Sequence, residues 1–511
     1  MPVVRTPLAG SIVTRSNDSA GTNVERQYFK NCFPLIKQNP ITKNLKLFLA
    51  RRTSINSGTV ADADFVGDMG CCVWGLTSPR ATFSYYNAGT SEVKVYWMSG
   101  GSGTLIGAAI ANANRCYGLS DTRISNVPTL LANCNYTVDG YRHYWWIADG
   151  GVAWARITDV DFPPNQTPQV YLMGNAAHMD GFMFVMDING RIWNSDLNSV
   201  TSWSAIGFID AQSFPDSGRD LARSRNLIVA FLSKHIEFFQ NSGNATGSPL
   251  SRVNGATIPI GITSGFGQVK AIGDDVYFLG VPAASGNLGV YKLTGTSVEK
   301  ISSVDIDSIL KPYANGSCTI TGSVALNGQT HLVIGFSTGF GFRNPLAYCL
   351  ETGYWWDFEI ATTTNIVAAA SESGSPYFTS STAAQGQKVF YNTTSPYTNN
   401  AIDEGVASTM EVRLFDNDQG VRNRKFCKSI AIIGPQLEAV SGTNEINVSY
   451  SNDGGATFST ARAIDLSSSE PVLPRLNRLG SYHRRIWKLT KTDTNPFVAE
   501  AIEEDFDVGT G

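Results

Sequence analysis

Short strand-like runs dominate the pattern of apolar and polar residues along the chain. Runs rich in Val, Ile, Thr and aromatic residues recur between clusters of Gly, Asn, Asp and Ser, as in the sequence VKVYWMSGGSG that begins at Val93. Runs of this length between turn-forming residues are typical of β-strands, whereas a helix needs apolar residues three and four positions apart over a longer window. Helical periodicity is hard to find here. The pattern therefore predicts an all-β protein.

A motif of two short aromatic strands around a polar turn returns along residues 61–400. Its copies begin at Val93, His143, Phe182, Leu227, Asp275, His331 and Pro376. Their spacing is close to the about 40 to 50 residues of a four-stranded propeller blade. Because one hairpin pair cannot bury its apolar face alone, radial stacking of blades would bury it. We therefore expect a β-propeller of six or seven blades over residues 61–400. The large side chains expected between blades are Trp146, Trp193, Phe231 and Trp356.

Two segments flank the repeat region. Residues 1–60 break at Pro34 and Pro40 and alternate poorly, which indicates an extended N-terminal arm with a short strand near residues 45–49. After the polar run NTTSPYTNNAIDEG, residues 401–511 contain shorter alternating strands such as STMEVRLF, KFCKSIAIIG and RIWKLT. These strands predict a separate small C-terminal β-sandwich or β-sheet domain.

Charge is distributed unevenly along the 511 residues, whose formal net charge is -4. The N-terminal arm is basic and the body that follows it is acidic. Such a pattern favours docking of the arm to an acidic partner surface or to DNA phosphates. The simpler alternative is a solvated arm. The candidate docking residues of the arm are Lys43, Lys46, Arg51 and Arg52.

A second basic segment, residues 474–491, contains no acidic residue, and we call it the basic stretch. Strand alternation would place Arg485, Trp487 and Leu489 on one face, so that neither face is purely apolar. The acidic residues at 500–507 offer a neutralising partner from the same or an adjacent subunit. We therefore rank a hairpin or subunit contact above a surface that faces DNA phosphates. The candidate residues for either role are Arg475, Arg478, Arg484, Arg485 and Lys488.

The chain offers little catalytic chemistry. It contains no P-loop, nucleophile-elbow or HExxH motif, and its five histidines have no close spacing suited to a metal ion. Acidic pairs such as Asp305 with Asp307 could serve a glycosidase, but acids two positions apart are common in turns. We expect no catalytic, cofactor-binding or metal site, and hence no enzyme.

The cysteines and the chain's apolar segments bear on where the protein is made. Eight cysteines occur without a CxxC pair, which in a reducing compartment indicates buried thiols rather than disulfide bridges. The first residues lack the apolar core of a signal peptide, and no segment approaches the apolar length of a membrane span. These features favour synthesis and folding in a cytosol.

One motif favours a different class of protein. Residues 451–458, SNDGGATF, match the Asp-box pattern S-x-D-x-G-x-T-[WF] and resemble the hairpin turns of sialidase-like propellers. In that family the Asp binds local backbone amides away from the catalytic centre. A sialidase-like or glycan-binding propeller is therefore the alternative interpretation. A single box outside the repeat region supports a hairpin more than catalysis.

An ordered set of stretches resembles the packaged-DNA stabilisation proteins of short-tailed bacteriophages, also called tail hub, tail tube or nozzle proteins. The stretches are ARITDVDFPPN from Ala155, FLSKHIEFFQNSG from Phe231, GITSGFGQVKAIGDDVYFLG from Gly261, VSYSNDGGATFS from Val448 and RLNRLGSYHRRIWKLT from Arg475. Their order agrees with that family, and they cover roughly residues 150–310 and 445–490.

The resemblance implies a structural part of the virion tail, synthesised in the host bacterial cytoplasm, rather than an enzyme. It implies a homohexameric ring, with a propeller in each subunit, that docks below the portal or head-tail adaptor protein and continues the DNA channel. Such a hub helps to retain packaged double-stranded DNA, without sequence specificity, and to deliver it into the host. Contacts with a tail fibre, tailspike or tail needle protein are also implied. A cofactor and a membrane span are not.

Overall fold

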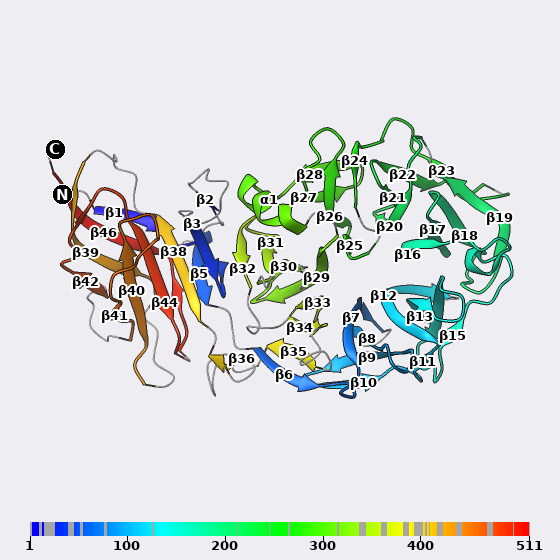
Figure 1. The fold of residues 1–511 in the computed structure, drawn as a ribbon, viewed down its shortest axis with the longest axis horizontal. Coiled ribbons are helices and arrows are strands. Elements are labelled where there is room, and N and C mark those ends of the chain that lie inside the picture. The colour runs from blue at the N-terminus through cyan, green and yellow to red at the C-terminus, as the bar shows by residue number, and fades with distance from the viewer. Residues whose placement is uncertain are drawn as a thin grey trace.

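The computed structural model has two lobes side by side, a large ring and a smaller layered lobe that contains both termini (Figure 1). Strands dominate both lobes. The described residues contain one α-helix, α1 (Val304–Leu310), and two 3-10 turns, η1 (Pro163–Asn165) and η2 (Lys311–Tyr313), so the all-β prediction is confirmed. The structure describes residues 3–9, 13–14, 26–38, 45–51, 55–75, 79–124, 127–211, 213–244, 246–263, 266–313, 316–336, 344–358, 365–381, 388–392, 402–403, 406–407, 409–415, 423–435, 442–467, 474–493 and 495–509.

The described strands of the large lobe form the seven antiparallel blades of a β-propeller. Blade 1 contains β7 (Val66–Trp74), β8 (Arg80–Asn87), β9 (Glu92–Ser99), β10 (Ser102–Leu105) and β11 (Ile110–Ala111). Blade 2 contains β12 (Ala113–Ile124), β13 (Val127–Tyr136), β14 (Arg142–Ala148) and β15 (Ala155–Arg156). Blade 3 contains β16 (Leu172–Met179), β17 (Phe182–Asp187), β18 (Arg191–Ser195) and β19 (Trp203–Asp210).

Blades 4 to 7 repeat this arrangement. Blade 4 contains β20 (Gly218–Ser224), β21 (Leu227–Leu232), β22 (Ile236–Asn241) and β23 (Leu250–Arg252). Blade 5 contains β24 (Ile260–Gly261), β25 (Val269–Ile272), β26 (Asp275–Pro282), β27 (Gly289–Thr294) and β28 (Ser297–Lys300). Blade 6 contains β29 (Cys318–Leu326), β30 (Gln329–Phe336), β31 (Leu346–Cys349) and β32 (Trp355–Asp357). Blade 7 contains β33 (Ile366–Glu372), β34 (Ser375–Ser380), β35 (Lys388–Asn392) and β6 (Ile55–Thr59). Each copy of the sequence repeat falls in a different blade, which confirms the predicted propeller.

A segment that precedes blade 1 in the chain closes the ring. β6 pairs antiparallel with β35, so residues 55–59 supply the outer strand of blade 7. Blades 6 and 7 also meet through a parallel bridge between Gly322 and Ala369. Gly322 has a φ of 149°, and a Cβ there would collide with the Ala369 carbonyl oxygen. The close approach of these two inner strands therefore requires glycine.

Each blade buries both faces against its neighbours. In β21, Ile228 and Ala230 pack toward blade 3, whereas Phe231 packs toward blade 5. Trp193 packs between blades 2 and 3, and Trp146 lies partly buried against the same cluster. These side chains fill the spaces between blades as predicted. Burial on both faces also explains why many blade strands are continuous apolar runs rather than alternating ones.

Trp356 belongs to a larger core than the one predicted for it. It lies on β32 in a cluster that contains residues of blades 6 and 7 and of the smaller lobe. Its ring centroid lies 5.9 Å from that of Phe33, a residue of the N-terminal arm. The two lobes therefore share one hydrophobic core, which opposes their separation.

The smaller lobe is a β-sandwich built from both ends of the chain. One sheet contains β1 (Val3–Pro7), β46 (Ala501–Val508), β39 (Lys425–Ile433), β42 (Arg475–Asn477) and β43 (Ser481–Tyr482). The other contains β41 (Arg462–Asp465), β40 (Glu445–Ser451), β44 (Ile486–Lys491), β38 (Met410–Phe415), β3 (Arg26–Lys30) and β2 (Val13–Thr14). A parallel bridge between Lys30 of β3 and Asp357 of β32 joins this sheet to blade 6. A three-stranded sheet of β4 (Cys32–Gln38), β5 (Leu45–Arg51) and β45 (Val498–Ala499) and a hairpin of β36 (Ile402–Asp403) and β37 (Val406–Ala407) complete the described strands.

The described part of the N-terminal arm is not a separate unit, so the predicted division at residue 60 needs correction. β1 pairs with β46, β3 with β38 and β5 with β45, so arm strands complete sheets formed by residues 410–508. Phe29, Phe33 and Leu49 are each 1% exposed. Burying a large apolar side chain contributes about 1.5–3 kcal/mol, which outweighs the mutual repulsion of exposed cations. Apolar burial therefore holds the arm in the sandwich.

Two further expectations concern cysteines and membranes. All eight cysteines are free thiols and all except Cys72 are buried, which confirms that they are core residues rather than bridges. No helix among the described residues is both long and apolar enough to cross a membrane.

Candidate interaction surface

The basic stretch crosses both sheets of the sandwich. β42 and β43 pair with β39 at the edge of one sheet. β44 lies between β38 and β40 in the other sheet. The stretch therefore contains edge, turn and central-strand positions, and its cations have different surroundings.

Arg485 is buried in an aromatic cluster, with 2% of its area exposed. Its guanidinium carbon lies 3.9 Å from the ring centroid of Tyr450, 4.0 Å from that of Tyr482 and 4.9 Å from that of Trp487. Its Nε donates a hydrogen bond to Asn452 Oδ1 at 3.0 Å. Burial lowers the pKa of Arg485, while the faces of the rings stabilise the desolvated cation. Arg485 is therefore not the surface contact residue that the sequence predicted.

Two lysines of β44 have acidic partners within the sandwich. Lys488 is half-buried, and its Nζ lies 3.5 Å from Glu411 Oε1. Lys491 is buried, and its Nζ donates to Asp493 Oδ2 and to Asn444 Oδ1, each at 2.7 Å. Burial lowers the pKa of Lys491, and the Asp493 carboxylate opposes that shift. Both lysines serve the sandwich itself.

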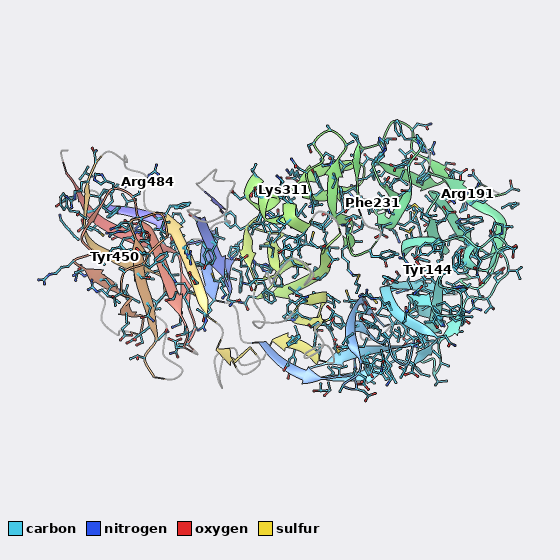
Figure 2. All side chains as sticks on the ribbon, in the orientation of Figure 1. Tyr144, Arg191, Phe231, Lys311, Tyr450 and Arg484 are labelled. Carbon is cyan, nitrogen blue, oxygen red and sulfur yellow. The ribbon has the colours of Figure 1, made fainter. Side chains whose placement is uncertain are left out.

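Three arginines of the basic stretch are exposed, and they are Arg475, Arg478 and Arg484. Arg475 lies on β42 opposite Ala431 of β39. Arg478 occupies a turn position with a φ of 60°. Arg484 lies in the turn before β44, on the sandwich (Figure 2). Another molecule could therefore reach these three arginines, which are predicted contact residues of the basic stretch.

Three of the five acidic residues at 500–507 form ion pairs with cations outside the basic stretch. The ion pairs are Arg5 with Glu503 at 2.9 Å, Lys46 with Glu500 at 3.0 Å and Lys428 with Asp507 at 2.8 Å. Glu504 is buried and accepts hydrogen bonds from Trp487 Nε1 at 2.6 Å and from the Tyr482 hydroxyl at 3.0 Å. Four of these five acidic residues thus have partners other than the exposed arginines of the basic stretch.

The candidate docking residues of the N-terminal arm also differ from one another in their surroundings. Lys43 and Arg52 lie outside the described residues. Lys46 is exposed and pairs with Glu500 of the same chain. Arg51 is 2% exposed and donates to the backbone carbonyl oxygens of Asp493 at 2.5 Å and Asn495 at 3.0 Å. Arg51 therefore fastens the arm to the sandwich and is not an exposed docking residue, which corrects that prediction.

A surface cavity lies beside Arg484. Its volume is about 510 Å³, and it is lined by Arg424, Asn452, Ser481, Tyr482, His483 and Arg484. The three basic residues of this lining are exposed, and Arg424 Nε donates to Ser481 Oγ at 3.0 Å. Arg424 and Asn452 were not candidates from the sequence, because no local pattern connects them to the basic stretch. Strand pairing around β39 and β40 brings them there.

A second cavity, of about 860 Å³, lies on the propeller axis and is lined by the inner strand of every blade. Lys270 of blade 5 reaches across to blade 1, where its Nζ donates to the Cys71 carbonyl oxygen at 3.0 Å and lies 3.3 Å from Cys71 Sγ. Asp220 of β20 is buried, and burial raises the pKa of its carboxyl to about 8. Across the described ranges, no group of three or more His, Cys, Asp and Glu residues could hold a metal ion.

The Asp-box forms the turn between β40 and β41. Asp453 accepts hydrogen bonds from Ser451 Oγ at 2.6 Å and from the Thr457 backbone N–H at 3.0 Å. These bonds hold the pKa of Asp453 well below its usual range. The prediction of a local hairpin turn is confirmed, and the carboxylate is occupied by its own turn.

Comparisons with known proteins give one family match, which lies within the propeller. No curated protein matches the chain. The similar solved structures include the computationally designed Ika8 protein, with 12% identity, a TM-score of 0.35 and coverage of 71% of this chain and 84% of that chain. Another is the extracellular domain of a hybrid two component system from B. thetaiotaomicron, with 7% identity, a TM-score of 0.43 and coverage of 86% of this chain and 62% of that chain. Residues 135–340, from blade 2 to blade 6, match the family model described as bacteriophage P22 Gp10, beta-propeller, which supports a phage structural protein with a role in DNA stabilisation.

Proposed function

We propose that the chain is a structural protein of a bacteriophage tail, a homohexameric hub or nozzle that helps to retain packaged DNA and to deliver it into the host. The observation that carries this proposal is the family match over residues 135–340. The hydrophobic core shared by propeller and sandwich supports it. Close-packed interiors transmit strain with little compression, which suits a part that holds a ring around DNA.

In the proposed hub, double-stranded DNA runs through the ring of subunits and not along the axis of each propeller. The axial cavity of about 860 Å³ has the size of a small-molecule pocket. Lys270 and Cys71 also meet across that axis. The channel wall would then contact phosphates without reading the base sequence.

The expected neighbours are the portal or head-tail adaptor protein on one side and a tail fibre, tailspike or tail needle protein on the other. The exposed cations of the sandwich are the candidate contacts. Arg475→Glu combined with Arg484→Glu separates the possible roles, because both side chains are exposed and the fold does not depend on them. Loss of hub assembly at all salt concentrations supports a protein contact. Intact tails that leak DNA, with salt-sensitive retention, support a phosphate contact.

The proposed role is not enzymatic. The Asp-box, which motivates the sialidase-like alternative, lies in the sandwich and not in a blade. Its carboxylate is held by Ser451 and Thr457. Turnover of a sialoside by the purified protein, abolished by one carboxylate substitution within the propeller, would overturn the structural role.

The hub itself is tested by mixing the purified protein with its head-tail adaptor and measuring particle mass together with low-resolution images. We expect six copies of the chain in a ring with a central channel. Particles that remain single chains on a fully assembled adaptor would contradict the proposal.

A further inference from the structure

Two residues that line the cavity beside Arg484 contact a buried cation that has unused hydrogen-bonding capacity. Neither Nη1 nor Nη2 of Arg485 has a hydrogen-bond partner among the described residues, and both atoms are buried. The guanidinium contacts Asn452 and Tyr482, which both line the cavity. A buried donor without an acceptor costs about 1–3 kcal/mol, and more when it is charged. An acceptor that enters the cavity would recover part of that cost.

The rim of the cavity selects the charge of such an acceptor. Arg424, His483 and Arg484 are exposed around it, and no described carboxylate lines it. The Asp453 carboxylate is engaged with Ser451 and Thr457 in the Asp-box turn. The buried Glu504 carboxylate acts on Arg485 through its charge, but it accepts hydrogen bonds from Tyr482 and Trp487 and does not line the cavity. The cavity therefore favours an anion that the described part of this chain does not supply.

The surroundings favour a carboxylate of a protein over a DNA phosphate. Phe426 is 47% exposed and pairs with Ser481 of the cavity wall, so an apolar ring borders the basic rim. Duplex phosphates lie on a convex surface and are met by exposed cations, whereas Arg485 is recessed. A flexible Asp or Glu side chain can enter a recess, and a guanidinium binds a carboxylate in a bidentate manner. Buried Arg and aromatic residues are also typical anchors of protein interfaces.

We infer that this cavity is a docking site for a carboxylate side chain from an acidic segment of another protein chain. Arg485 is the buried anchor, and Arg424 and Arg484 attract the acidic segment at the rim. Asn452 is exposed, and rotation of its amide away from Arg485 Nε would open the path to the guanidinium. The rings of Tyr450 and Tyr482 already hold the guanidinium in place, so binding requires little further ordering of that side chain.

Asn452→Asp gives the sharpest test, because it places a carboxylate of nearly the same shape in the cavity. The full-length protein is titrated into a fluorescein-labelled hexaglutamate peptide, and binding is followed by fluorescence anisotropy.

We expect Asn452→Asp to weaken peptide binding at least about tenfold, because the new carboxylate would itself occupy the Arg485 guanidinium. The same substitution should raise the melting temperature. Arg424→Ala combined with Arg484→Ala should weaken binding several-fold without changing the melting temperature. Arg475→Ala is the matched control, because it removes an exposed arginine outside the cavity and should change neither quantity.

Two further measurements complete the test. A 20-base-pair DNA duplex should bind more weakly than the peptide and should respond to Arg475→Ala as much as to Asn452→Asp. Sedimentation of the protein alone identifies the source of the acidic segment: self-association lost in Asn452→Asp indicates a second copy, and a monomer that binds the peptide indicates a different tail protein. Unchanged peptide affinity in both cavity variants, or equal loss in Arg475→Ala, would overturn the inference. Such a failure would not change the ring that we expect when the protein is mixed with its adaptor. Failure of this inference and failure of the proposed function are therefore distinguishable.

Discussion

Arg51→Ala should open the sandwich at two places that are far apart in the sequence. The side chain is 2% exposed and donates to the backbone carbonyl oxygens of Asp493 and Asn495. Removing it leaves one buried acceptor, on Asn495, and one partly buried acceptor, on Asp493, without these donors. A buried acceptor without a donor costs about 1–3 kcal/mol and a partly buried one costs less, so we expect a loss of about 2 kcal/mol or more in total. Lys491 still neutralises the Asp493 carboxylate from 2.7 Å, so we add nothing for that charge.

Hydrogen exchange measured by mass spectrometry resolves this change locally, which matters because a chain with two lobes need not unfold in one step. A loss of 2 kcal/mol corresponds to about 30-fold faster exchange through local opening, since 1.4 kcal/mol is a factor of ten. We expect at least this acceleration in β5 and in β45 together, and little change in blades 2 to 5. Arg5→Ala is the control, because the Arg5 side chain is 67% exposed and its pair with Glu503 stabilises by about 0–1 kcal/mol at most. Acceleration in β5 alone, or equal effects of the two substitutions, would refute the assignment of the arm to the sandwich.

Three other predictions concern the propeller and its thiols. Gly322→Ala should destabilise the junction of blades 6 and 7 by about 1–3 kcal/mol, because its Cβ would meet the Ala369 carbonyl oxygen. Gly328→Ala also introduces a side chain at a positive φ but meets no atom, so thermal unfolding should show a smaller loss for it than for Gly322→Ala. Burial raises the pKa of the Asp220 carboxyl to about 8 in the folded protein, against about 3.9 in the unfolded chain. Its contribution to the free energy of unfolding is therefore complete below about pH 4, and this contribution is lost as the pH rises to 8. The difference in melting temperature between wild type and Asp220→Asn should therefore change between pH 4 and 8 and level off above pH 8, and a constant difference would contradict the burial argument. Alkylation under denaturing, non-reducing conditions should modify all eight cysteines, and any unmodified pair would reveal a disulfide.

The propeller could be predicted from the sequence because its chemistry is local. Each blade contains a hairpin of apolar strands around a polar turn, and the copies from Val93 to Pro376 occur at regular intervals. Radial stacking is a physical consequence of hairpins that cannot bury their faces alone. The exact number of blades could not be predicted, because the fourth strand of blade 7 comes from residues 55–59, before the first repeat.

The membership of the N-terminal arm could not be predicted, because strand pairing over long sequence separations leaves no local pattern. β1 pairs with β46 across almost the whole chain, with Arg5 opposite Glu503. The arm's excess of cations suggested docking to another molecule or a solvated arm, but Arg5, Lys46 and Arg51 have acidic partners near the other end of the sequence. The net charge of the N-terminal arm alone therefore predicted a solvated segment, whereas the folded protein neutralises part of that charge in ion pairs.

The candidate surface was predictable in part. Alternation placed Arg485 on the same face as Trp487 and Leu489, and that shared face was the available signal that Arg485 is buried. The sequence could not show that Tyr450 and Tyr482 would surround the guanidinium, since those contacts depend on β40 and β43 meeting β44 in three dimensions. For the same reason the cavity with Arg424 and Asn452 emerged from the structure alone.

The central claim is that this propeller and sandwich form a subunit of a phage tail hub. Cryo-electron microscopy of intact virions, with a reconstruction focused on the tail, tests it most directly. The account predicts six copies of a seven-bladed propeller, each with its sandwich, around a channel that contains DNA below the portal and adaptor. A tail reconstruction in which every density is assigned to other proteins, with none that fits this propeller and sandwich, would contradict it.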